Sequence, residues 1–292
     1  MLNHRQLEQY QCDGYLVVDG LFSPAEVAEL RVAADDPLVK RSLKAAGADE
    51  HIVHLLEITC KHPAFRELAR DTRVTDLVAQ LIGPDVQLQH SKLATKPPKK
   101  DAGAFAWHQD FAYFPHTNID LLAVMVMLDD ATPQNGCMSV VKGSHKAGQL
   151  SHQDRDGWFL GNCQESKYWD DHPENVVPIM PKAGGISIHH CLTLHSSPGN
   201  VSGSPRRGVV FQYRAADAYQ MSDHVWADTG FQVRGEFRDL ARCEAGTLRL
   251  SRSRGRKPNH FGNMYFQNGE CAKEWNVVQA SSLPLAVLPL PS

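Results

Sequence analysis

The chain has 292 residues, of which 42% are hydrophobic, and a formal net charge of −3 at pH 7. This length permits one sizeable hydrophobic core, and the composition is typical of a globular protein rather than a disordered one. The small negative charge and the lack of a recognition motif argue against a nucleic-acid-binding protein.

The sequence also bears on the compartment. We find no apolar run long enough to span a membrane, no signal-peptide pattern at the N-terminus and no peroxisomal tripeptide at the C-terminus. Seven cysteines without paired spacing favour reduced thiols over a disulfide framework. We therefore expect a cytoplasmic protein that does not associate with membranes.

Helices are predicted in the first third of the chain. Residues 3–12 have a helical pattern, and Asp13-Gly14 turns into a strand over residues 15–18. Ser23 followed by Glu26 forms a capping box that opens a helix over residues 24–34. Residues 62–83 indicate two helical segments with a break near residues 71–72.

From Val86 onward the pattern changes to short apolar runs separated by Pro, Gly and Asn turns. Many short strands of this kind are typical of a sandwich or barrel. We predict a single α+β domain over residues 1–292, with a helical part over about 1–84, a β core over about 85–215 and a C-terminal extension over about 216–292. The predicted strands lie at 87–95, 121–128, 138–141, 185–194 and 208–214.

The segment Trp107-His108-Gln109-Asp110 is the most informative motif. Side chains two residues apart on one strand point to the same face, so His108 and Asp110 are placed together. A short His-x-Asp pair is most often a surface histidine beside a turn aspartate. With one distant histidine, however, the pair makes the two-His-one-carboxylate set that holds Fe(II) and leaves positions open for a co-substrate and dioxygen.

Four histidines compete for the third ligand position: His145, His189, His190 and His195. If residues 187–195 form one unbroken strand, His189 and His195 share a face and His190 lies on the other. Parity therefore leaves both His189 and His195 open. Downstream, Arg206 provides a bidentate partner for a carboxylate, with Arg207 as the alternative because a one-residue slip would exchange their faces.

Several segments, taken in order, resemble the phytanoyl-CoA dioxygenase family of Fe(II)/2-oxoglutarate oxygenases. The resemblance begins at Asp13-Gly14-Tyr15 and extends to about Tyr213. The remaining segments that carry it are Gln89–Pro98, Trp107–Asp110, Asn135–Met138, Lys142–His145, Gly184–His190 and His195–Asn200 followed by Arg206.

This resemblance implies a double-stranded β-helix, a cupin-like jelly roll, with the N-terminal helices packed around it. It implies that His108, Asp110 and His195 bind Fe(II), with His195 on a later strand that faces the other two across the roll. His189 would then either form a hydrogen bond nearby or pack in the core, and we favour the core. It places the distal carboxylate of 2-oxoglutarate on Arg206. Ser197 and Lys96 would lie near this carboxylate, and Gln89 or Lys92 could line the same wall.

The implied reaction uses O2 and decarboxylates 2-oxoglutarate to succinate while a small molecule is hydroxylated. The substrate class is left open among secondary metabolites, amino acids and acyl thioesters. Because related halogenases lack the carboxylate ligand, Asp110 favours hydroxylation. An alternative is a cupin-like metal-binding protein or metalloenzyme that does not use 2-oxoglutarate, and a catalytically inactive scaffold is a further one.

Other features remain open from the sequence. Met125-Val126 stands where the family often has a tryptophan, which would reshape the space beside the co-substrate. The arginine-rich stretch 234–257 is either a solvated face or a binding site for an anionic group. The oligomeric state is not predicted. Aromatic and methionine candidates for a substrate wall or lid are Phe105, Phe111, Tyr113, Phe114, Met125, Trp158, Trp169 and Trp226.

Overall fold

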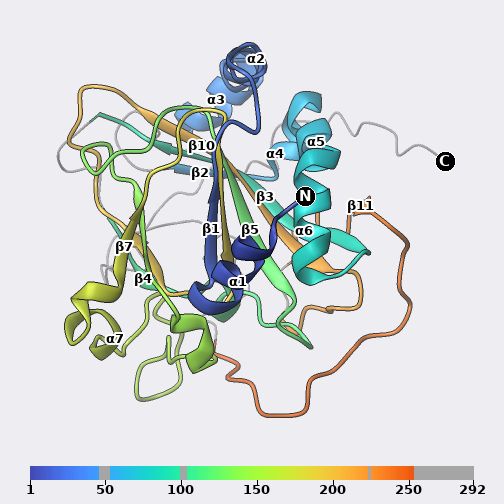
Figure 1. Cartoon of the computed structure of the whole chain (residues 1–292), viewed down its shortest axis with the longest axis vertical. Coiled ribbons are helices and arrows are strands. Elements are labelled where there is room, and N and C mark those ends of the chain that lie inside the picture. The colour runs from blue at the N-terminus through green and yellow to red at the C-terminus, as the bar shows by residue number, and fades with distance from the viewer. Residues whose placement is uncertain (46–52, 99–103, 223–224, 253–292) are drawn as a thin grey trace.

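The computed structural model describes residues 1–45, 53–98, 104–222 and 225–252 (Figure 1). Two antiparallel sheets face each other, and the N-terminal helices lie against the larger sheet. This is the predicted α+β jelly roll. Within the described residues, no helix is both long and apolar enough to cross a membrane.

The predicted N-terminal helices are confirmed. Capping boxes open α1 and α2, formed by Asn3 with Gln6 and by Ser23 with Glu26. The expected break after α5 is also present, and Asp71 caps the next helix by accepting from a backbone N–H. The helices are α1 His4–Asp13, α2 Pro24–Ala34, α3 Pro37–Ala45, α4 Ile58–Lys61, α5 Pro63–Ala69, α6 Thr72–Ile82 and α7 Lys167–Asp170, with 3-10 turns η1 Asp110–Ala112, η2 Ser144–Ala147 and η3 Pro173–Asn175.

The larger sheet contains seven strands in the order β1-β8-β5-β10-β3-β11, with β2 also paired to β3. Two of its strands, β1 and β2, come from the first 84 residues, so the part expected to be helical also contributes to the sheet. The strands are β1 Tyr15–Val18, β2 Val53–Leu56, β3 Val86–Lys96, β5 Leu121–Met127, β8 Ile186–His190, β10 Arg206–Ala215 and β11 Gln232–Arg234.

The smaller sheet has the order β4-β9-β6-β7, in which β4 is Phe105–His108, β9 is His195–Ser197, β6 is Met138–Val141 and β7 is Val176–Ile179. The run predicted as one strand over residues 185–194 ends at His190. After a turn, the chain begins β9 in this other sheet. The neighbouring strands β8 and β9 therefore belong to different sheets.

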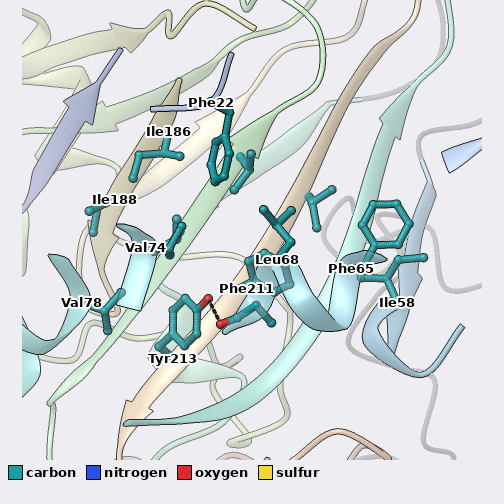
Figure 2. Packing of buried hydrophobic residues seen from close by; sticks show 14 of the residues in the cluster. Phe22, Ile58, Phe65, Leu68, Val74, Val78, Ile186, Ile188, Phe211 and Tyr213 are labelled. Carbon is teal, nitrogen blue, oxygen red and sulfur yellow. Dashed lines mark hydrogen bonds between the residues drawn. The ribbon is translucent and has the colours of Figure 1, made fainter. Parts of the chain in front are cut away.

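Alternation along each strand divides the large sheet into two faces. On β5, Leu122, Val124 and Val126 pack against the helices, while Ala123 and Met125 belong to small clusters on the other face. Figure 2 shows the helical side, where Phe65 and Val74 pack near strand residues such as Phe211. Burial of these apolar side chains fixes which face of the sheet turns inward.

One irregularity corrects the alternation of β3. Gln212 of β10 pairs with His90, but the next residue, Tyr213, pairs with Leu88, which leaves Gln89 in a bulge. Because of this extra residue, Leu88 and Leu93 both reach the apolar core even though their numbers differ by an odd interval.

Candidate metal centre and co-substrate pocket

His108, Asp110 and His195 lie together at the small sheet. His108 is the last residue of β4, and His195 is its Cα partner at the start of β9. Asp110 begins the 3-10 turn that follows β4 and is therefore not on the strand itself. His195 comes from the neighbouring strand of the same sheet rather than from across the roll, which corrects that expectation.

The buried amide of Gln109 explains why the chain leaves the strand between the two candidate ligands. Its Nε2 donates to the carbonyl oxygens of Gly148 at 2.9 Å and Leu192 at 2.7 Å, and its Oε1 accepts from the backbone N–H of Leu150 at 2.8 Å. These three hydrogen bonds anchor the turn, so that the carboxylate of Asp110 reaches the same cavity as His108.

The donor atoms of the three residues converge, with all ligand atoms within 4.8 Å of one another. Asp110 Oδ1 lies 3.9 Å from Nε2 of His108 and 3.8 Å from Nε2 of His195. The Nδ1 atom of each imidazole lies at hydrogen-bonding distance from a backbone carbonyl, that of Ala106 at 2.8 Å and that of Thr193 at 3.0 Å. Such bonds assign the proton to Nδ1 and leave the Nε2 lone pairs free for a metal.

The protonation states suit a divalent cation. Burial lowers the pKa of His108 to about 4 and lowers that of His195 well below its ordinary value, so both imidazoles are neutral near pH 7. Burial acts to raise the pKa of Asp110, but the neighbouring His195, a hydrogen bond with His189 and the nearby Lys92 outweigh it and hold that pKa low. Two neutral imidazoles and one carboxylate are the donor set suited to non-haem Fe(II).

Two further residues fix the carboxylate of Asp110. Its Oδ2 atom lies 3.1 Å from His189 Nε2 and accepts a hydrogen bond of 2.7 Å from Gln212 Nε2. This arrangement leaves Oδ1 directed at the two imidazoles. His189 is thus a buried hydrogen-bond partner of the carboxylate, which was the less favoured of its two expected roles. Gln212 was not singled out from the sequence.

Two buried cations occupy another part of the same cavity. Arg206 and Lys96 are Cα partners on β10 and β3, and they are 3% and 1% exposed. Lys96 Nζ donates to Ser197 Oγ at 2.7 Å and to the carbonyl of Pro198. Arg206 donates from Nη1 to the carbonyl of Gly136 at 2.7 Å, whereas its Nε has no partner among the described residues.

Burial disfavours the charged forms of these two basic side chains, and an anion bound beside them would offset that penalty. Burial and the nearby guanidinium lower the pKa of Lys96 to about 6, and burial lowers the pKa of Arg206 to about 10. Neither side chain has an ion pair with a carboxylate among the described residues. A bound carboxylate would supply the missing negative charge, so the residues present fit the distal end of 2-oxoglutarate.

Arg207 does not serve this pocket. It lies on the other face of β10, where its Nε donates to Asp129 Oδ2 at 2.9 Å. A register of β10 shifted by one residue would turn Arg207 toward the pocket in place of Arg206. This register is not adopted, because β10 pairs continuously with β3 from Arg206 and with β5 from Gly208.

The cavity opens to solvent, and the free space inside it and at its mouth amounts to about 850 Å³. Met125 lines it at the position where the family often has tryptophan. Among the aromatic candidates, Phe105, Tyr113, Phe114 and Trp226 line it as well, whereas Phe111, Trp158 and Trp169 do not.

Gln89 is not a lining residue, which corrects its expected place beside the co-substrate. Its Nε2 donates to Gln220 at 2.6 Å and its Oε1 lies 3.0 Å from His116 Nε2. The bulge in β3 is the physical reason, because it breaks the alternation on which a strand-based assignment depends. Lys92, the other residue considered for this wall, does line the cavity.

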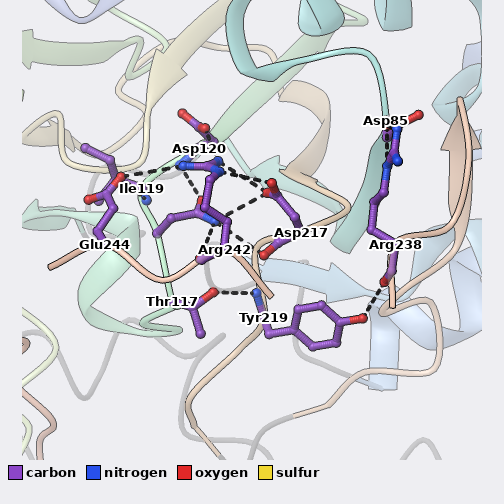
Figure 3. A network of polar contacts seen from close by, with 10 residues as sticks. Asp85, Thr117, Ile119, Asp120, Asp217, Tyr219, Arg238, Arg242 and Glu244 are labelled. Atoms are coloured by element: carbon purple, nitrogen blue, oxygen red, sulfur yellow. Dashed lines mark hydrogen bonds and ion pairs between the residues drawn. The ribbon is translucent and has the colours of Figure 1, made fainter. Parts of the chain in front are cut away.

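Three arginines of the arginine-rich stretch make ion pairs with carboxylates, and Figure 3 shows those of Arg238 and Arg242. Arg234 pairs with Asp76, Arg238 with Asp85 and Arg242 with Asp120 and Asp217. These pairs fasten the chain after β11 to the body of the roll. The part of the stretch from residue 253 to 257 lies outside the described residues.

A jelly roll that places two imidazoles and a carboxylate beside two buried cations has the architecture of Fe(II)- and 2-oxoglutarate-dependent dioxygenases. The chain is an enzyme of this class. A family model described as "Phytanoyl-CoA dioxygenase (PhyH)" matches residues 10–208. The chain therefore belongs to the phytanoyl-CoA dioxygenase family, as the sequence predicted.

Individual proteins show the same relationship. A probable alpha-ketoglutarate-dependent hypophosphite dioxygenase of Stutzerimonas stutzeri is 28% identical over 230 residues, which cover 74% of this chain and 80% of that protein. An ectoine dioxygenase of Sphingopyxis alaskensis is 28% identical over 235 residues, covering 73% and 76%. The solved structure of EctD from S. alaskensis with 2-oxoglutarate and 5-hydroxyectoine has a TM-score of 0.61 at 27% identity, covering 86% of this chain and 87% of that one.

Proposed function

We propose that this enzyme hydroxylates a small molecule, with His108, Asp110 and His195 as the iron ligands and Arg206 as the anchor of 2-oxoglutarate. The observation that carries the proposal is the placement of both sets in one cavity: three converging metal donors, and two buried cations without an ion-pair partner among the described residues. When bound, iron and 2-oxoglutarate supply the oxidising chemistry with dioxygen, and succinate and carbon dioxide are the by-products.

The residues of the chain position the reactants and neutralise charge. The two imidazoles remain neutral because they are buried, which keeps their Nε2 lone pairs available. His189 and Gln212 hold Oδ2 of Asp110, so that Oδ1 is presented to the metal. Arg206 offers a rigid guanidinium to the distal carboxylate of the co-substrate.

Lys96 and Ser197 complete the co-substrate end of the pocket. In the absence of an anion, Lys96 donates to Ser197 Oγ at 2.7 Å. A carboxylate placed beside Arg206 would accept from both side chains and return the pKa of Lys96 toward its ordinary value. Binding of 2-oxoglutarate is then coupled to the uptake of a proton by Lys96.

The identity of the substrate rests on the shape of the cavity and on the relatives. Aromatic side chains line much of the cavity, which opens to solvent. The relatives named for hypophosphite and ectoine indicate compact polar substrates. We therefore favour a small polar metabolite over a long acyl thioester or a nucleic acid, and a cytoplasmic site of action.

An anaerobic titration with Fe(II) and then 2-oxoglutarate tests the proposal without knowledge of the substrate. The expected result is a weak visible charge-transfer band that saturates with co-substrate. His108→Ala and Asp110→Ala should abolish iron binding, whereas Arg206→Ala should retain iron and require at least tenfold more 2-oxoglutarate. Iron retention in both triad variants would contradict the assignment of the metal site.

A cupin-like metalloenzyme that does not use 2-oxoglutarate is the competing function. It would bind iron without forming the band, and replacement of Arg206 would leave its activity intact. The buried basic side chains of Arg206 and Lys96 argue against this alternative, because an enzyme that does not use 2-oxoglutarate has no distal carboxylate to bind beside them.

A further inference from the structure

The cavity contains a third cationic side chain that the proposed chemistry does not use. Lys92 lines the cavity from β3, where its Cα partners are Leu56 on β2 and Val210 on β10. It lies four residues from Lys96, which is about 13 Å along a strand. Lys96 Nζ is directed to Ser197 and to the carbonyl of Pro198, whereas the charge that acts on Lys92 is that of Asp110, so the two lysines serve different parts of the cavity.

The charges in the cavity leave Lys92 in excess. Asp110 is the only carboxylate among the described residues that line the cavity. A divalent iron, the Asp110 carboxylate and the co-substrate dianion would together have a net charge of −1. The positive charge of Arg206 alone balances it. Lys96 faces the co-substrate as well. Burial lowers the pKa of Lys92 against the opposing charge of Asp110, and the loaded enzyme offers Lys92 no further negative group among the described residues that line the cavity.

Among the described residues that line the cavity, Lys92 has neutral hydrogen-bonding neighbours, and Asp110 is the only acid. Burial, reinforced by the charge of Lys92, lowers the pKa values of His54 and His90 well below the ordinary range. His90 has a buried Nδ1 atom without a hydrogen-bond partner among the described residues. A lysine beside a neutral imidazole with an unused polar atom forms a site for an anionic, hydrogen-bonding group.

The wall next to this site is aromatic. His90 lies 4.4 Å from the ring of Trp226 and 5.3 Å from that of Phe114, measured between ring centroids. Tyr113, which also lines the cavity, lies 5.6 Å from the ring of His108. These rings offer a surface to hydrocarbon and continue toward the metal donors.

We propose that the substrate is a small organic anion whose carboxylate, phosphonate or phosphinate group binds Lys92 and His90, with its hydrocarbon part against Trp226 and Phe114. The substrate C–H bonds are then held between this anion site and the metal. The inference rests on the proposed function, since it places the substrate beside the iron and 2-oxoglutarate of that site.

The test measures binding to the anaerobic Fe(II)·2-oxoglutarate complex, with the visible band as proof that the complex has formed. Three probes of similar shape are added: isobutyrate, isopropylphosphonate and the neutral isobutyramide. Affinities are obtained by calorimetry and by the rise in melting temperature. We expect at least one anion to bind at least tenfold more tightly than the amide. The tighter of the two anions identifies the class of head group.

Variants assign that preference to Lys92. Lys92→Gln should weaken binding of the preferred anion at least tenfold while the affinity for 2-oxoglutarate stays within about twofold, and Lys92→Arg should restore most of it. Lys96→Gln is the matched control, since it should weaken 2-oxoglutarate and leave anion binding unchanged once the co-substrate is saturating.

Three results would overturn the inference: equal binding of amide and anions, no binding of either anion to the wild type, or unchanged anion affinity in Lys92→Gln with the band intact. Failure of the band to form in the wild-type protein is a different result. It would refute the proposed function, and the inference with it.

Discussion

Replacement of Lys96 by methionine should stabilise the metal-free protein and weaken co-substrate binding. Methionine keeps most of the hydrocarbon stem but removes the charge from a side chain that is 1% exposed. If Lys96 serves to bind the co-substrate, its burial should destabilise the protein when no ligand is bound.

The structure gives the magnitude. The folded-state pKa of Lys96 is lowered to about 6 from an ordinary 10.5, so the unfolded chain binds more protons between these pH values. The penalty is largest at and below about pH 6 and shrinks as the pH rises toward 10.5. At pH 7.5, three units below the ordinary pKa, it is about 4 kcal/mol. The variant also loses the hydrogen bonds to Ser197 and Pro198, which lowers its stability by about 2 kcal/mol. The expected net gain in the free energy of unfolding is therefore about 2 kcal/mol.

Thermal unfolding of the metal-free protein at about pH 6, 7.5 and 9 measures this gain. The variant should melt several degrees above the wild type at pH 7.5, with a larger difference at pH 6 and a smaller one at pH 9. Its 2-oxoglutarate dissociation constant, from the anaerobic band titration, should rise at least tenfold. Lys142→Met, at an exposed lysine, is the control and should change neither quantity.

The reasoning is refuted if Lys96→Met is less stable than the wild type at pH 6, or if the difference in stability does not change with pH. Unchanged affinity for 2-oxoglutarate would show that Lys96 has only a structural role in this corner of the roll.

Three other changes test the site and its surroundings. Gln212→Leu removes the 2.7 Å bond to Asp110 and should reduce Fe(II) affinity about 10- to 100-fold in calorimetry, so unchanged affinity would contradict its positioning role. Gly136→Ala places a Cβ 2.5 Å from the carbonyl oxygen of Pro198 at a φ of +76°, and should cost about 1–3 kcal/mol in chemical denaturation and weaken 2-oxoglutarate binding. Arg242→Ala breaks exposed ion pairs and should cost less than about 1 kcal/mol, with unchanged co-substrate affinity; a large loss of affinity would assign its segment to the pocket.

The local sequence determined most of the elements and pointed to the main candidate site residues. Capping boxes at Asn3 and Ser23 and the caps around Asp71 set helix ends through bonds that span only a few residues. Such short-range signals act before any tertiary contact is made. His108 and Asp110 were paired from their spacing, and the family resemblance selected His195 and Arg206. All four line one cavity.

Tertiary structure decided what spacing could not. The bulge at Gln89 shifts the alternation of side chains along β3. Because β8 ends at His190, His189 and His195 lie on different sheets, yet both side chains approach Asp110. Gln212 is a partner of that carboxylate only because β10 forms one wall of the same cavity. Each of these outcomes depends on contacts between residues far apart in sequence. A strand's alternation fixes which side chains share a face, but only the packing of two sheets fixes what that face meets.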